Sequence, residues 1–149
     1  MNPLIATWPP ILYTDYGKEN YENWVNVGGF DSIVIRPNGK VMKTLTKLSI
    51  QKLLHPFQTF ILGQKNMAPK LAAKLGINLV FYGENEAEYG NPIAENSKSL
   101  RDKSYFAVDN LNKIHLAGMI IKNLKKDYDL DIKDLKIFLP IEKKDLKKN

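Results

Sequence analysis

The sequence has 149 residues, of which 44% are hydrophobic and 10% aromatic, so it can bury the core of one ordinary domain. It contains no cysteine, which excludes disulfides, thiolate nucleophiles and cysteine-ligated zinc sites. The first ten residues lack the basic region of a signal peptide, and no run approaches the roughly 18 apolar residues that span a bilayer. We therefore expect a cytoplasmic protein without a transmembrane segment.

The first part of the chain predicts two buried strands and two helices. Pro3–Trp8 is mostly apolar and is closed by two prolines, which is typical of a strand. Asn20–Val27 has mixed helical spacing and ends at a glycine pair. Phe30–Arg36 predicts a second strand. From Lys40 to about Leu54, apolar residues recur on one helical face, which predicts a helix that packs on a sheet.

The middle of the chain predicts a further helix and a third strand. Asn66 is a candidate helix cap, Pro69 falls in the first turn, and Gly76 ends the helix. Ile77–Tyr82 is apolar nearly throughout and predicts a strand. Apolar strands that alternate with helices indicate an α/β fold, with a parallel sheet covered by helices on both faces.

The last third of the chain is predicted with less regular structure. A long polar loop is expected up to Ser104, followed by a helix from Asp109 to about Leu124. Leu135–Ile141 is compatible with an edge strand or an extended arm. The lysine-rich stretch 142–149 is expected to be a solvated tail, so the domain is assigned to residues 1–141.

Charge is distributed unevenly along the chain, whose formal net charge is +6. No Asp or Glu occurs between Ser32 and Gly83, a stretch with many lysines, and four glutamates follow within residues 84–95. A basic surface beside carboxylates suits an anionic ligand that carries a metal ion, such as a magnesium-bound nucleotide. A solvated basic face explains the same composition equally well.

The loop after the third predicted strand is the richest candidate site. Ligands of parallel α/β sheets bind beyond the carboxyl ends of the strands, so Thr7 should lie near the loop from Gly83 to Gly90. That loop carries glutamates at alternate positions, which repel one another unless a cation lies between them. A solvated acidic loop is the alternative.

Three basic residues, His55, Lys65 and His115, are further candidates for ligand contacts. His55, at the end of a predicted helix, can simply complement the helix carbonyls, and His115 is expected to pack within a helix, so no zinc site is expected. Lys65 precedes a predicted helix N-terminus, where a lysine and free amides favour an anion.

Several stretches together resemble the N-acetyl sugar amidotransferases of lipopolysaccharide O-antigen sugar synthesis. The similarity runs from Asn2 to about Ile141, and its most specific elements are Gly83-Glu84-Asn85 and Glu88-Tyr89-Gly90. The other matching stretches are Trp24–Asp31, Pro37–Lys40, His55–Phe57 and Phe60–Asn66.

The resemblance implies an ATP pyrophosphatase of the PP-loop superfamily, with an adenine nucleotide alpha hydrolase-like sheet of five parallel strands. Such an enzyme uses ATP and magnesium to adenylylate the acetamido oxygen of a nucleotide-linked sugar. Ammonia then displaces AMP and leaves an acetamidino group. The ammonia is expected from a glutaminase and a cyclase-like companion protein.

The chain departs from the family pattern at one important place. Family members carry a cysteine-rich segment and then a strand followed by a Ser-Gly-Gly-Lys-Asp-Ser loop that holds pyrophosphate, and the sequence contains neither. In the family's strand order this strand is central, between the strands that correspond to Pro3–Trp8 and Ile77–Tyr82. The resemblance thus implies a C-terminal portion with an incomplete sheet, and an N-terminal fragment of the same enzyme as a partner.

The family's site residues are carried over where the motifs match. Glu84 and Asn85 are the expected catalytic residues, with Glu84 also a magnesium ligand. Thr7 and Gly83 are the expected nucleotide contacts. Expected contacts to the sugar substrate are His55, Lys65 and Tyr89.

Two other functions stay open. The chain could be a non-catalytic module that binds a sugar nucleotide or a partner protein and has lost the ATP site. A nucleic-acid-binding domain is the least favoured, because the only two arginines, Arg36 and Arg101, are not interleaved with aromatic residues. We therefore expect no nucleic-acid partner.

Overall fold

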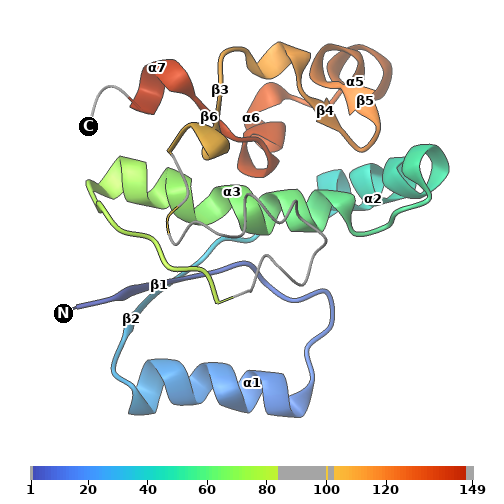
Figure 1. Ribbon diagram of the computed structural model, residues 1–149. Coiled ribbons are helices and arrows are strands. Elements are labelled where there is room, and N and C mark those ends of the chain that lie inside the picture. Colours follow the sequence, from blue (N-terminus) through green and yellow to red (C-terminus); the bar gives the residue numbers. More distant parts are fainter. Residues whose placement is uncertain (1, 84–99, 101–102, 147–149) are drawn as a thin grey trace.

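The first two strands form the parallel pair that the sequence predicts. The computed structural model describes residues 2–83, 100 and 103–146. Strand β1 (Leu4–Thr7) pairs with β2 (Asp31–Val34) in parallel, with Leu4 opposite Asp31 and Thr7 opposite Val34. The pair lies between a helix of the connecting segment, α1, and the long helix α3 (Figure 1). The first two strand predictions are therefore confirmed, and a mixed α/β organisation with them.

The connection between β1 and β2 is helical. Helix α1 (Asp15–Glu22) begins after Thr14, whose hydroxyl accepts a 3.0 Å hydrogen bond from the Gly17 amide. A π-helical turn, η1 (Asn23–Val27), continues it to the predicted glycine pair. A helix was expected here, but it begins five residues earlier than the apolar spacing indicated.

Helix α2 (Gly39–Leu53) agrees with its prediction almost to the residue. The Asn38 side chain caps it by accepting hydrogen bonds from the Lys40 and Val41 amides, at 2.9 and 3.4 Å. Its inner face is buried at Val41, Leu45 and Leu48, while its lysines lie on the outer face or at its ends. The amphipathic pattern therefore identified the right elements and the right face.

Helix α3 (Gln58–Leu75) begins eight residues before the predicted cap at Asn66. Gly63 lies within this earlier part of the helix and allows close packing, since a Cβ atom there would lie 2.4 Å from the Trp8 ring. Asn66 is buried inside the helix, and its side-chain amide donates a 2.9 Å hydrogen bond to the Phe138 carbonyl. Gly76 ends the helix with a left-handed φ of 69°, as predicted.

The prediction of a third strand at Ile77–Tyr82 is wrong. Ile77–Tyr82 is assigned to neither helix nor strand, although its sequence is strongly apolar. Strands persist only where a neighbour satisfies their backbone groups, and among the described residues β1 pairs with β2 alone. The segment leaves the end of α3 and runs across the side of the helix that carries β1 (Figure 1).

The helix predicted from Asp109 is also wrong. This stretch forms a 3₁₀ turn, η4 (Leu111–Lys113), a hairpin of β4 (His115–Leu116) and β5 (Met119–Ile120), and helix α5 (Ile121–Tyr128). Ala117 and Gly118 both have positive φ, at 55° and 75°, which makes the tight hairpin turn that breaks the helix. The apolar residues counted as one helical stripe are instead divided between a hairpin and a shorter helix.

The C-terminal end returns to the body of the molecule through short elements. Leu135–Ile141 was expected to be an edge strand or an arm, and only its last residue is in a strand. The elements here are the 3₁₀ turn η3 (Lys103–Phe106), strand β3 (Ala107–Val108), helix α6 (Ile132–Leu135), the 3₁₀ turn η5 (Lys136–Phe138), strand β6 (Ile141–Glu142) and helix α7 (Lys143–Leu146). Strand β6 pairs in parallel with β3. The expected solvated tail therefore begins with a helical turn, and Lys143 within it bonds Asp109 at 3.1 Å.

The core lies between the α2–α3 layer and the C-terminal elements. Its fully buried side chains include Leu45, Leu116, Leu124, Leu135, Phe138 and Leu139. Trp8, just beyond β1, joins it through an edge-to-face contact with Phe138, with the ring centroids 5.7 Å apart. In the part of the chain that the structure describes, no helix combines the length and apolar character needed to cross a bilayer.

Candidate functional site

Aromatic residues from two separate parts of the chain, Tyr82 and Tyr105–Phe106, meet beside Lys65 of α3. Tyr82 stacks on Phe106, with nearly parallel rings and centroids 5.8 Å apart. Tyr105 packs edge-to-face against Phe106 at 5.1 Å. The Lys65 ammonium lies 3.8 Å from the centre of the Tyr105 ring, a cation–π contact. We call these four residues, Lys65, Tyr82, Tyr105 and Phe106, the aromatic cluster.

A proline inside α3 explains why the cluster forms at this turn. Pro69 has no amide hydrogen, so the carbonyl four residues earlier, that of Lys65, has no helical donor. The Tyr82 hydroxyl takes that place and donates a 2.7 Å hydrogen bond to the Lys65 carbonyl. The proline that suggested a helix start therefore creates an acceptor in mid-helix, and this acceptor anchors the chain next to Gly83.

Three predicted site residues lie outside the described residues: Glu84, Asn85 and Tyr89. Gly83, immediately before them, is exposed, and a Cβ atom there would meet no described atom within 4 Å. The described residues therefore leave room for a ligand beside Gly83, the predicted nucleotide contact.

Thr7 is the last residue of β1, as expected for a residue at the carboxyl edge of a sheet. Its carbonyl accepts a 3.1 Å hydrogen bond from the Ile35 amide, and its side chain is half-buried. The backbone of Thr7 is thus hydrogen-bonded to the β2 side. The Thr7 hydroxyl is therefore the group of this residue that can contact a ligand.

Lys65 lies at a different kind of position from the one predicted. It was expected just before a helix N-terminus, where free amides attract anions, but it is in the middle of α3 and those amides are already bonded within the helix. Its ammonium group is half-buried against the Tyr105 ring. Any anion would be held by this side chain rather than by the helix end.

His55 is not brought together with Lys65. It is exposed in the turn between α2 and α3, where its ring meets Phe57 edge-on at 6.4 Å. Lys65 is about two helical turns, or roughly 10 Å, further along α3. His115 lies in β4 and is exposed, so the predicted burial of its ring within a helix is wrong.

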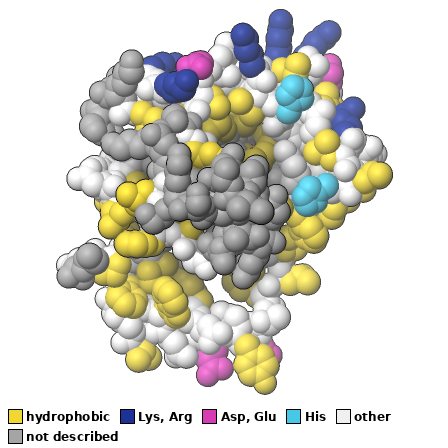
Figure 2. Space-filling model, in the orientation of Figure 1, with side chains coloured by type: hydrophobic (Ala, Val, Ile, Leu, Met, Phe, Trp, Pro, Cys, Tyr) yellow, Lys and Arg dark blue, Asp and Glu magenta, His cyan; other side chains and the backbone are white. Residues whose placement is uncertain are grey.

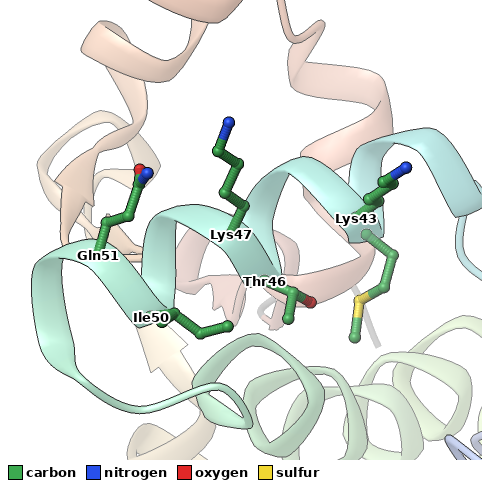
Figure 3. Close-up of a pocket in the computed structure, with 6 residues that line it drawn as sticks. Lys43, Thr46, Lys47, Ile50 and Gln51 are labelled. Carbon is green, nitrogen blue, oxygen red and sulfur yellow. The ribbon is translucent and has the colours of Figure 1, made fainter.

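A shallow cavity of about 480 Å³ lies along α2 (Figure 3). Its lining comes from this helix alone and includes Lys43, Thr46, Lys47 and Ile50. Lys43 and Lys47 point away from α3, the green helix in Figure 3, whereas Ile50 and Thr46 point toward it. None of the predicted site residues lines this cavity.

The described residues do not fit the phosphates of ATP. No glycine-rich loop precedes a helix N-terminus within them, since Gly28 and Gly29 lead into β2. No group of three His, Asp or Glu side chains able to hold a metal ion occurs in residues 2–83, 100 or 103–146. The expected magnesium ligand, Glu84, lies outside those ranges.

Comparison with known protein families found no family model that matches the chain, and no curated protein matches it either.

The bond between Tyr82 and Lys65 can be tested by a single substitution. Tyr82→Phe keeps the stacking on Phe106 but removes the donor to the Lys65 carbonyl, so we expect a loss of about 0.5–1.5 kcal/mol in the free energy of unfolding. Tyr16→Phe, at a residue 80% exposed, is the matched control and should have no measurable effect. Urea unfolding of both variants gives the comparison, and equal stability of the two would contradict the anchoring role.

Proposed function

We propose that this chain is the C-terminal portion of an ATP-dependent amidotransferase that converts the acetamido group of a nucleotide-linked sugar to an acetamidino group. Its place is in the synthesis of surface polysaccharide sugars, in the cytoplasm, with ammonia from glutaminase and cyclase-like partner proteins. The strand and phosphate loop that it lacks come from an N-terminal part of the same enzyme, and the completed fold is the parallel sheet of that superfamily.

The free edge of β1 is the observation that supports this proposal most strongly. Because the Thr7 carbonyl bonds Ile35, the backbone of Thr7 and of Ile5 faces β2, and that of Leu4 and Ala6 faces the opposite edge. No described residue pairs with this opposite edge. Unpaired edges of this kind accept a further strand.

The exposed apolar segment Ile77–Tyr82 is a second observation that supports a missing strand beside β1. It has the sequence of a buried strand, yet Leu79 is 50% and Phe81 81% exposed. Hydrophobic side chains also gather over the layer that contains β1, β2 and α1, while lysine and arginine gather at the opposite end (Figure 2). An inserted strand that pairs with β1 would provide this segment with both a neighbour and a cover.

The aromatic cluster supports the substrate side of the proposal. It fixes the chain on either side of the segment that contains Glu84, Asn85 and Tyr89, and it bonds Tyr82, the residue before Gly83, to the Lys65 carbonyl. We assign Glu84 and Asn85 to the activated acetamido group, with Glu84 as a ligand of magnesium. Thr7 and Gly83 would contact the nucleotide, and Lys65 and Tyr89 the sugar nucleotide. His55, in the turn before α3, would contact a more distant part of the sugar nucleotide.

Reconstitution tests the proposed function. The chain is mixed with a fragment that carries the cysteine-rich segment, the first strand and the Ser-Gly-Gly-Lys-Asp-Ser loop, and supplied with ATP, magnesium, ammonia and an acetamido sugar nucleotide. We expect release of AMP and pyrophosphate that depends on the sugar and on both polypeptides. A stable complex that binds the sugar nucleotide without cleaving ATP would instead identify a non-catalytic binding module.

A further inference from the structure

A second cavity lies on the other side of α3 from β1, and it contains none of the residues assigned above. It has a volume of about 460 Å³ and is lined by residues of the C-terminal half of α3, of β6 and of α7. Figure 1 shows α7 beside this end of α3. Its charged lining comprises Lys70, Lys74, Lys136, Glu142 and Asp145. Its apolar lining comprises Ala73, Leu111, Pro140 and Ile141.

Lys70 is the most constrained of the three lysines. Its ammonium group donates a hydrogen bond to the Lys136 carbonyl, one helical turn beyond the bond from Asn66 to Phe138. Burial, together with the nearby Lys136 ammonium, lowers the pKa of Lys70 to about 8. A fixed, partly desolvated ammonium group therefore lines the cavity, and the Lys136 carbonyl is its acceptor.

The charges around the cavity leave an excess of positive groups. Lys70 and Lys74 come from α3, and Lys136 comes from η5. Of the two carboxylates, that of Glu142 is already bound by Lys144 at 3.1 Å, which leaves Asp145 of α7 to oppose three ammonium groups. The hydrogen bond that joins α3 to η5 accounts for the position of Lys70 by itself. It does not account for Lys74 or for the Lys136 side chain beside the same cavity.

We propose that this cavity binds a small organic phosphate, with its phosphate group among Lys70, Lys74 and Lys136. Three ammonium groups supply charge-assisted hydrogen bonds to a dianion. The apolar wall of Leu111, Pro140 and Ile141 would hold the organic part, and the volume falls within the usual range of ligand sites. The proposal is independent of the amidotransferase assignment.

Titration of the full chain with phenyl phosphate and with inorganic phosphate tests this site. We expect phenyl phosphate to bind more tightly than inorganic phosphate, because only the former can use the apolar wall. In NMR pH titrations of the lysine side chains, the pKa of Lys70 should rise when phenyl phosphate is bound, since a bound anion stabilises the ammonium form. Equal affinity for the two probes, or an unchanged Lys70 titration, would overturn the proposal.

Two exposed lysines provide variants that keep the fold. Lys74→Gln and Lys136→Gln retain the bond from Lys70 to the Lys136 carbonyl, and each should weaken phenyl phosphate binding about tenfold. Lys47→Gln, on the outer face of α2, changes the net charge equally and should leave the affinity within twofold. Similar weakening by all three variants would show a general charge effect and contradict a defined site.

Discussion

Glu84→Gln is expected to lower the turnover of the reconstituted enzyme by about a hundredfold or more. The amide keeps the size of the side chain and most of its hydrogen bonding, but it removes the charge that a magnesium ion or a developing cation requires. Assembly of the two polypeptides should be unchanged. Steady-state release of pyrophosphate from ATP, at saturating sugar nucleotide and ammonia, measures the effect.

Lys40→Ala is the control for this prediction. Lys40 is exposed in the first turn of α2, and its replacement changes the net charge by one unit in the opposite direction, so a general field effect would shift the turnover of the two variants by similar amounts with opposite signs. We expect its turnover to stay within a few-fold of the parent. If the reconstituted enzyme is active and Glu84→Gln also stays within a few-fold, the assignment of Glu84 is wrong.

Phe138→Ala should cost about 3–5 kcal/mol in the free energy of unfolding, the range for a large aromatic side chain removed from a core. The Phe138 side chain is fully buried, it packs against Trp8, and its carbonyl accepts the bond from Asn66. A loss of this size is a large part of the total stability of an ordinary domain. Thermal and urea unfolding of the isolated chain should therefore show a much lower melting temperature and urea midpoint for the variant than for the parent.

Phe81→Ala makes the same chemical change at an exposed residue. Phe81 is 81% exposed, so we expect a change within about 0.5 kcal/mol in the isolated chain. Comparable losses in the two variants would mean that Ile77–Tyr82 is packed in the isolated chain, which would contradict its role as a surface that awaits a partner strand.

The elements that the sequence predicted well are those whose signals are local. Asn38 caps α2 by its own side chain, and the lysine face of that helix needs no distant neighbour. Both strands of the β1–β2 pair are short apolar runs bounded by prolines or glycines. In each case the residues that cause the helix or strand to form lie within or next to the element itself.

The predictions failed where a distant contact decides the conformation. Asn66 and Pro69 predicted a helix start, but α3 begins earlier and already includes Gly63, on which the Trp8 ring packs. Ala117 gives no sequence signal for positive φ, yet the hairpin turn requires it there. Tyr82, Tyr105 and Phe106 were missed as a site because residues far apart in the sequence make their contacts. The one usable signal was Pro69, which leaves the Lys65 carbonyl without a helical donor and so open to the Tyr82 hydroxyl.

Amide hydrogen exchange at Ala6 tests most directly whether the edge of β1 that no described residue pairs with receives a strand from an N-terminal part of the enzyme. In the isolated chain the Ala6 amide should exchange much faster than that of Thr7, whose backbone faces β2. Addition of the N-terminal fragment should slow Ala6 by about a hundredfold or more and protect the amides of Ile77–Tyr82 as well. A complex in which Ala6 and Ile77–Tyr82 exchange as fast as in the isolated chain would contradict the insertion of a strand at this edge.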